Sequence, residues 1–563
     1  MLAGRRSAIV MLLFACGCGR EIAQTATRDP TATEELETSC LVPITDLPAA
    51  PAWASGKLED TPLVATSYGA GEGPGLFITA RDAYRVYLNG KLIRESRAPR
   101  KSDFVPLTLV PGDNTLAVAV WAAQGTPMAL LQLDDLTESY VSDETWRAEL
   151  APQPGFAAPE YGGEGTPAIV YGRLGGFPGC DPPAPFPQAS VSSWVGPTTG
   201  SDSSVLLRRV VRIAPLGFGE KATGGGSAAP SVVTTYDELE ALASGNDDPA
   251  VIFMPEGDYD FRRKGSEITS RLACVSACTE DATKLQYSLL PTGSTCATSQ
   301  MMVSTEERRL QLGSNKTIVG LGRGAHVRGI SLDFGSQKNI VLRNLAVYDV
   351  NRALQEGGDA IGMAGASDVW VDHVTAKWIS DGLTDILEGT EGITLSWMHF
   401  DGANPADCRG RHTHASTLRG ATITLHHCFF DHTDSHAPLV ENPTARVHVF
   451  NDLVQDNDSY GVAAGCGAQV LLEGTAFRGV ASPTLRRDCN DGTQPGLISA
   501  VAGTNLYLQD VGNHAGGDGK EPNDTVFTPT YDYEAEPAAD SWPRVFERAG
   551  VGGPWRRTLS LEP

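Results

Sequence analysis

A short pattern of alternating apolar residues recurs along the chain between about residues 315 and 512. Each copy has two apolar positions separated by one residue, then a polar or aromatic pair, then another apolar position. The copies are KNIVLRNLAV (338–347), SDVWVDHVTA (367–376), EGITLSWMHF (391–400), ATITLHHCFF (421–430), ARVHVFNDLV (445–454), AQVLLEGTAF (468–477) and TNLYLQDVGN (504–513). Self-similarity at a period of roughly two dozen residues indicates a solenoid. Because no helical pattern separates the copies, the sequence predicts an all-β chain containing a β-solenoid.

One position in each repeat, just after the first strand, should face its counterparts in the neighbouring coils. These positions hold Asn344, His373, Trp397, His427, Asn451 and Gly474. In stacked coils they would form a polar and aromatic ladder that satisfies backbone groups at the bends. We therefore expect His373 and His427 to be structural rather than catalytic.

A separate β-sandwich is expected at 41–160, before the repeats. YRVYLNGKLI (84–93) reads as two strands joined by an Asn-Gly turn, and LTLVPGDNTLAVAVWA (107–122) has the same form. The pattern resembles the galactose-binding-like jelly rolls appended to many carbohydrate-active enzymes, although a purely structural accessory domain is an alternative. Residues 161–214, rich in Gly and Pro at their start, should form a junction, residues 215–535 the solenoid, and residues 536–563 a C-terminal tail.

The N-terminus indicates export. Arg5 and Arg6 precede the apolar run 8–15, which is too short to span a bilayer, and Cys16 follows. This arrangement resembles the lipobox of bacterial lipoproteins, so residues 1–16 are expected to be a lipoprotein-type signal and 17–40 a polar tether. The only membrane contact would be a lipid anchor at Cys16; ordinary cleavage and release is the alternative.

Cysteine content and charge fit a secreted or cell-envelope protein. Of 11 cysteines, removing Cys16 leaves 10, an even number that is compatible with disulfides. The formal net charge of −24 argues against nucleic acid as a partner. It would also repel an acidic glycan unless the binding site were cationic or metal-loaded. We expect a monomer.

Segment 215–480 resembles the pectate lyase superfamily, polysaccharide lyase family 1. The matching pieces are GFGEKATGGG (217–226), SNKTIVGLG (314–322), VWVDHV (369–374), DGLTDI (381–386), ITLSW (393–397) and TLHHCFFD (424–431). The resemblance implies a right-handed parallel β-helix. It also implies calcium-assisted β-elimination from an acidic polysaccharide such as polygalacturonate or pectin. In this reaction a base removes the C5 proton while calcium and basic side chains neutralise the adjacent carboxylate.

By the same resemblance, Asp359, Asp381 and Asp385 match the family's calcium carboxylates. Carboxylate oxygens are the ligands that calcium prefers, so these aspartates are the expected metal ligands. Gly357 stands where the family often has a further acid, which makes the expected site one ligand thinner.

The family's basic residues are replaced in this chain. His436 and Glu441 stand for the two arginines of its Arg-x-Pro-x-x-Arg arrangement, and its lysine falls near Asn404. One hypothesis keeps catalysis, with His436 as the base and Arg409 and Arg411 in place of the lysine. An imidazole with the ordinary pKa of about 6.5 is mostly neutral at pH 7, as a base must be. The other hypothesis is a non-catalytic carbohydrate-binding relative on the cell surface.

Two further alternatives stay open at this point. Hydrolysis of a glycosidic bond by water needs two carboxylates, which could come from Asp381, Asp385 and Glu441. A transition-metal site needs an extended segment that places alternate residues on one face, as in His432, Asp434 and His436.

Overall fold

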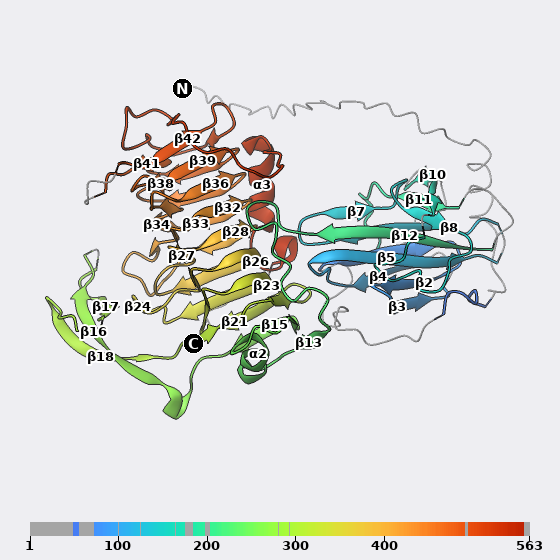
Figure 1. Ribbon diagram of the computed structural model, residues 1–563, viewed down its shortest axis with the longest axis horizontal. Helices are drawn as coiled ribbons and strands as arrows, with labels where there is room; N and C mark the ends of the chain where they lie inside the picture. The colour runs from blue at the N-terminus through green and yellow to red at the C-terminus, as the bar shows by residue number, and fades with distance from the viewer. Residues whose placement is uncertain are drawn as a thin grey trace, which may run out of the picture.

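The computed structural model describes residues 49–55, 73–98, 101–123, 125–163, 165–174, 184–197, 203–279, 281–291, 293–489 and 494–556. A tall stack of strands lies beside a smaller β unit formed by the N-terminal part of the chain (Figure 1). The expected signal at 1–16, its Cys16 and the tether at 17–40 lie outside the described residues.

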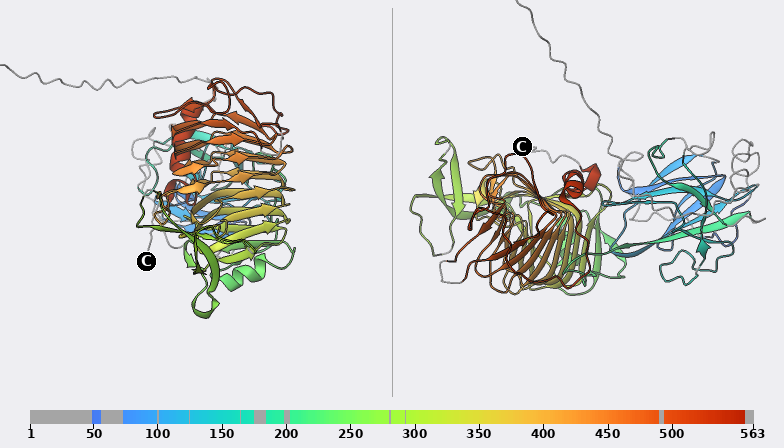
Figure 2. Two further views of the ribbon diagram at one scale, coloured as in Figure 1. Left: turned by 90° about the vertical axis from the view of Figure 1, so that its left-hand side faces the viewer. Right: turned by 90° about the horizontal axis from the view of Figure 1, so that it is seen from above.

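The repeats are parallel strands of one 17-stranded sheet, here called sheet C. Its first part comprises β13 (Pro230–Val232), β14 (Ala250–Met254), β15 (Gly257–Asp260), β20 (Lys316–Gly320), β21 (Ala325–Arg328), β23 (Lys338–Val350), β26 (Ser367–Ile379), β28 (Glu391–Ser396) and β29 (His399–Asp401). It continues through β32 (Thr422–His426), β33 (Phe429–Asp431), β36 (Arg446–Phe450), β37 (Leu453–Asn457), β39 (Gln469–Glu473), β40 (Ala476–Val480), β42 (Leu497–Ala500) and β43 (Leu506–Tyr507). Successive coils stack directly on one another (Figure 2), so the predicted β-solenoid is confirmed.

A second parallel sheet, sheet E, forms another side of the stack. Its strands are β19 (Arg308–Gln311), β22 (Ile330–Gly335), β25 (Ile361–Ala364), β27 (Asp385–Leu387), β31 (Thr417–Leu418), β35 (Leu439–Val440), β38 (Val462–Ala464) and β41 (Thr484–Arg486). The short strands β30 (His412–His414) and β34 (Thr433–Ser435) pair beside it.

Equivalent apolar residues of successive coils fill the interior. The register aligns Leu342, Val371, Leu395, Leu425, Val449 and Leu472 in one buried column. At this spacing each coil covers the apolar face of the next, which explains why the sequence repeats its pattern.

The expected ladder is also present. Each of its members has a positive φ of 50–59°, so the backbone turns there in the left-handed conformation. The ring of His373 stacks on Trp397 at 5.6 Å between centroids, and Trp397 stacks on His427 at 4.4 Å. Asn344 donates its side-chain N–H to the carbonyl of Gly320 at 2.8 Å, within the bend. The predicted stacking of His373 and His427 in the ladder is confirmed.

The N-terminal unit consists of two antiparallel six-stranded sheets. One contains β1 (Gly75–Ala80), β4 (Ser102–Pro106), β6 (Ala129–Asp134), β7 (Ser139–Val141), β10 (Ile169–Arg173) and β11 (Ser193–Gly196). The other contains β2 (Ala83–Leu88), β3 (Lys91–Ser96), β5 (Gly112–Trp121), β8 (Arg147–Glu149), β9 (Thr166–Pro167) and β12 (Ser204–Ile213). The two sheets share one apolar core. They also draw strands from residues 161–214, so the sheets extend past residue 160; the galactose-binding-like type stays a prediction.

That apolar core continues into the solenoid. Leu107 and Leu109 belong to the same buried cluster as Val319, Val341 and Trp370 on the outer side of sheet C. The N-terminal unit is therefore packed onto the stack rather than tethered beside it.

Two helices cover parts of the stack. Helix α2 (Tyr236–Ala243) begins after its N-cap Thr235, which forms a capping box with Glu238. Helix α3 (Ala538–Arg548) lies in the expected tail and packs its Val545 against the ladder residue Trp397. Neither helix is both long and apolar enough to cross a membrane, and the described residues contain no other candidate.

An antiparallel arm projects from the stack (Figure 1, lower left). It is built from β16 (Thr269–Ala277), β17 (Leu285–Leu289) and β18 (Ser299–Thr305), and β17 pairs with β24 (Leu354–Gln355). Disulfides join Cys274 to Cys296, Cys278 to Cys408 and Cys466 to Cys489. Cys428 is buried with a free thiol, so not all the cysteines after Cys16 are paired.

Candidate active site

The expected metal ligands come together at the ends of neighbouring strands in sheet E. Asp359 lies just before β25, Asp381 precedes β27, and Asp385 begins β27, with Gly362 opposite Asp385 in the register. Asp359 Oδ1 accepts the N–H of Gly382 at 3.0 Å, and Asp385 Oδ1 accepts the N–H of Thr417 at 2.8 Å. The parallel register therefore places all three carboxylates on one side of the stack.

These carboxylates lie in a partly buried and strongly negative environment. Burial, followed by the charges of Asp385 and Asp381, raises the pKa of Asp359 to about 8. Burial and the charge of Glu356 raise the pKa of Asp381 to about 6, and burial raises that of Asp385 to about 6. A group whose ionised form is disfavoured by like charges gains from a nearby cation.

A cleft of about 230 Å³ opens beside Asp359 and Asp381. Arg271 of the arm and Arg309 of β19 also line it. Arg309 forms an ion pair with Asp333 at 2.7 Å.

Three histidines follow on the next coils. The rings of His414 and His436 stack with centroids 4.2 Å apart, and Tyr460 lies 5.8 Å from His436. Nδ1 of His436 is 3.5 Å from the hydroxyl of Thr417, whose N–H binds Asp385. Burial lowers the pKa of His436 to about 3 and that of His412 to about 4, so both imidazoles are neutral at pH 7.

Two arginines approach this group from sheet E. Arg419 and Glu441 pair at 3.2 Å, and Arg487 reaches the same carboxylate at 3.8 Å. Gly465 lies on the coil between Glu441 and Arg487, in ordinary contact distance of both. The charges of Arg487 and Arg419 both contribute to the low pKa of His436.

Comparisons with known proteins fit this geometry. The pectate lyase family model matches residues 290–491. Pectin lyase D of Aspergillus niger is 30% identical over 332 residues, which cover 56% of this chain and 86% of that protein. The chain belongs to the pectate lyase family. Pectin lyase 2 of Aspergillus oryzae is 32% identical over 277 residues, which cover 47% of the present chain and 72% of the Aspergillus oryzae protein.

Among solved structures, a pectate lyase from Bacillus sp. N165 in complex with trigalacturonate is similar to this chain. The alignment covers 60% of the present chain and 99% of the Bacillus protein. The two are 21% identical and the TM-score is 0.42.

The structure does not bring Arg409 and Arg411 to the carboxylates of this lyase family member. Arg409 pairs with Asp434 and, at 2.6 Å, with Asp458, while Arg411 pairs with Asp458 at 2.7 Å. Of the predicted catalytic residues, only His436 lies beside the carboxylate group.

Arg419 and Arg487 were missed by the sequence reasoning. Each comes directly after a strand of sheet E, Arg419 in the sequence TLRG and Arg487 in the sequence TLRRD. Arg487 is far from Glu441 along the chain, although the two side chains meet in space. The repeating strand pattern could have revealed them, had the strands of sheet E been aligned with one another.

The three aspartates fit calcium in donor chemistry, because they are oxygen ligands whose charges are only partly compensated. Among the described residues, two groups of three metal-ligating side chains have ligand atoms within 4.8 Å of one another, and the aspartate trio is neither of them. Coordination would therefore require the side chains to turn toward a common point.

One compact group is Asp431, His432 and Asp456; the other contains the disulfide-bonded Cys466 and Cys489. Asp434 is held by Arg409 instead of joining His432 and His436. The alternating transition-metal site considered from the sequence is thus not assembled.

Proposed function

We propose that this chain binds an acidic polysaccharide of the polygalacturonate or pectin type and cleaves it by β-elimination. The observation that supports the proposal best is the clustering of Asp359, Asp381 and Asp385 next to a neutral His436 that two guanidinium groups approach. The pectin lyases among its relatives carry the same activity in their names.

In this proposal Asp359, Asp381 and Asp385 hold calcium, which when bound neutralises a carboxylate of the substrate. Arg419 and Arg487 orient the same or the next uronate group. Glu441 holds both guanidinium groups in place while leaving each side chain 39% exposed.

His436 is the proposed base. Its imidazole takes the C5 proton, the C5–H electron pair forms the C4–C5 double bond, and the C4–O bond breaks as its electrons leave with the oxygen. With a pKa of about 3, the imidazole of His436 is a weak base. A bound uronate carboxylate would raise this pKa, because a nearby negative charge stabilises imidazolium.

Carbohydrate binding without turnover is the second candidate. The observation that favours it is the neutralisation of nearby arginines: Glu441 engages Arg419 and Arg487, and Asp458 engages Arg409 and Arg411. Such a protein would bind the polymer at the candidate active site without releasing an unsaturated product.

The test is the ultraviolet absorbance of the unsaturated product from polygalacturonate and from methyl-esterified pectin, with calcium and with a chelator. We expect turnover by the wild type, none by His436→Phe, and a loss of about tenfold to hundredfold in kcat/KM for Arg487→Gln, as for one charge-assisted contact. Arg446→Gln is the matched control, since Arg446 donates to the carbonyls of Pro443 and Ala445. A flat wild-type trace with retained polymer binding would identify a glycan-binding relative.

Export to an oxidising compartment is part of the same proposal. The disulfides Cys274–Cys296, Cys278–Cys408 and Cys466–Cys489 are of the kind that persist outside the cytosol. Lipidation at Cys16 remains a prediction, which mass spectrometry of the mature N-terminus can test.

A further inference from the structure

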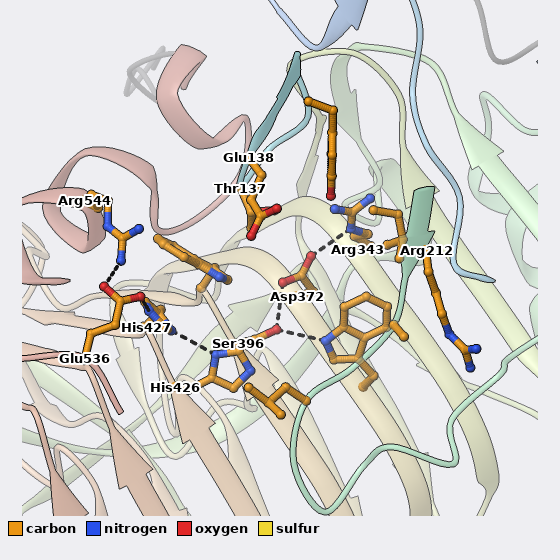
Figure 3. Close-up of a pocket in the computed structure, with 16 residues that line it drawn as sticks. Thr137, Glu138, Arg212, Arg343, Asp372, Ser396, His426, His427, Glu536 and Arg544 are labelled. Atoms are coloured by element: carbon orange, nitrogen blue, oxygen red, sulfur yellow. Dashed lines mark hydrogen bonds and ion pairs between the residues drawn. The ribbon is translucent and has the colours of Figure 1, made fainter. Parts of the chain in front are cut away.

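A second pocket, of about 300 Å³, lies at the junction between the N-terminal unit and sheet C (Figure 3). Its walls come from the turn between β6 and β7, the end of β12, strands β23, β26, β28 and β32, and the segment that leads into α3. The carboxylates of the candidate active site belong to sheet E, so this junction pocket is a separate feature.

Buried polar groups that satisfy one another form the floor of the junction pocket. Arg343 donates from Nε to Asp372 at 2.8 Å and from Nη2 to Asp135 at 2.9 Å. Ser396 donates to the other oxygen of Asp372 at 2.7 Å and accepts the indole N–H of Trp370 at 2.9 Å. This network fixes the shape of the pocket before any ligand enters.

His426 differs from these groups. Its ring is 93% buried, its Nδ1 lies 3.1 Å from Nδ1 of His427, and its Nε2 has no hydrogen-bond partner within the described part of the chain. Nε2 of His427 faces the carboxylate of Glu536 at 3.7 Å. Because a carboxylate only accepts, the proton of His427 belongs on Nε2, and its Nδ1 must accept from Nδ1–H of His426. Nε2 of His426 is then a buried acceptor that requires a donor.

The charges around the pocket indicate which ligand would supply that donor. Three guanidinium groups and three carboxylates line it, namely Arg212, Arg343 and Arg544 against Glu138, Asp372 and Glu536. Because these formal charges balance, the lining gives an anionic ligand no advantage. The mixture of acceptors and donors suits hydroxyl groups, which can do both.

We propose that the junction pocket binds a neutral sugar unit of hexose size, with one hydroxyl donating to Nε2 of His426. Glu138 and Glu536 accept from other hydroxyls, and the exposed Arg212 at the mouth donates. Tyr140 supplies apolar surface against the sugar's C–H groups. The proposal is independent of lyase activity, since the two sites share no residue.

The experiment is isothermal titration of the full chain with methyl α-D-galactopyranoside as the neutral probe and with D-galacturonate as the acidic one. We expect saturable binding of the neutral probe and weaker binding of the uronate. His426→Phe, which keeps a ring but removes the acceptor, should weaken binding at least about tenfold. His432→Phe, the same substitution outside the pocket, should bind like the wild type.

A second variant, which fills the pocket from another residue, tests the proposal even if His426→Phe does not fold. Thr137 lies on the turn between β6 and β7 and lines the pocket. Its backbone carbonyl, rather than its side chain, accepts a hydrogen bond from Arg548. Thr137→Trp should therefore block the pocket while this hydrogen bond is kept. We expect Thr137→Trp to abolish sugar binding while product formation from the polymer is unchanged. The absence of wild-type binding, uronate binding that is as tight as that of the neutral probe and is lost in Thr137→Trp, or unchanged affinity in both pocket variants would each overturn the proposal.

Discussion

Arg343 offers the sharpest test of how the two parts of the chain are joined. Its guanidinium is 2% exposed and binds Asp372 on sheet C, Asp135 in the N-terminal unit and the carbonyl of Leu109 at 3.1 Å. Arg343→Met keeps much of the volume but leaves two buried carboxylates without their cation. Removing one partner from a buried ion pair costs about 3–5 kcal/mol of unfolding free energy.

Urea denaturation followed by tryptophan fluorescence measures this loss, because Trp370 lies in the same interface. Arg94→Met is the matched control: Arg94 pairs with Asp103 at 3.1 Å but is 44% exposed, and such pairs contribute about 0–1 kcal/mol. The triple variant Asp135→Asn, Arg343→Met, Asp372→Asn should recover part of the loss, since the unpaired charges are removed with the arginine. If Arg343→Met lost no more than Arg94→Met, the buried network would not be joining the two units.

Three further predictions concern calcium, pH and the arm. Calcium at a hundred times its Kd should stabilise the fold by about 2.7 kcal/mol in thermal unfolding; an equal rise in Asp381→Asn would exclude that ligand. The folded pKa of His436, about 3, lies below its unfolded value of 6.5, so stability is full above pH 6.5 and falls as the pH drops toward 3. His436→Phe should therefore lose less stability than the wild type between about pH 7 and pH 5 in urea titrations, and an equal loss would contradict the assigned pKa. Replacing Cys278 and Cys408 together by serine removes a link across 130 residues and should cost about 2–5 kcal/mol of unfolding free energy, whereas unchanged stability would argue against the link.

The solenoid could be predicted because its physical cause is local and repeated. Residues such as Val371 and Leu395 sit in equivalent places of successive coils, and each must be apolar to cover the next. The ladder followed from the same register, which is why His373 and His427 could be assigned to structure before any coordinates.

The cationic side of the candidate site could not be found in that way. Arg409 and Arg411 were chosen because they lie near the family's lysine position in the sequence, but Asp458, 49 residues from Arg409, holds them elsewhere. Arg419 and Arg487 reach Glu441 only because loops of different lengths return sheet E to the same register. Long-range electrostatic partners of this kind depend on loop paths that local patterning does not determine.

The strands at the end of the N-terminal unit were missed for a different reason. Residues 161–214 begin with many Gly and Pro residues, which favour irregular structure, but they end in SVLLRRVVRI, which forms β12 alongside β5. Composition averaged over the segment concealed a strand whose alternating apolar residues complete the core.

The apolar core shared by the N-terminal unit and sheet C has a practical consequence for protein engineering. A truncated chain that started after β12 would leave Val319, Val341 and Trp370 facing water, because Leu107 and Leu109 are part of what covers them. Such a fragment would be prone to self-association even if its coils folded. Anyone transplanting the solenoid into another scaffold should carry the N-terminal sheets with it, or redesign that outer face with polar side chains.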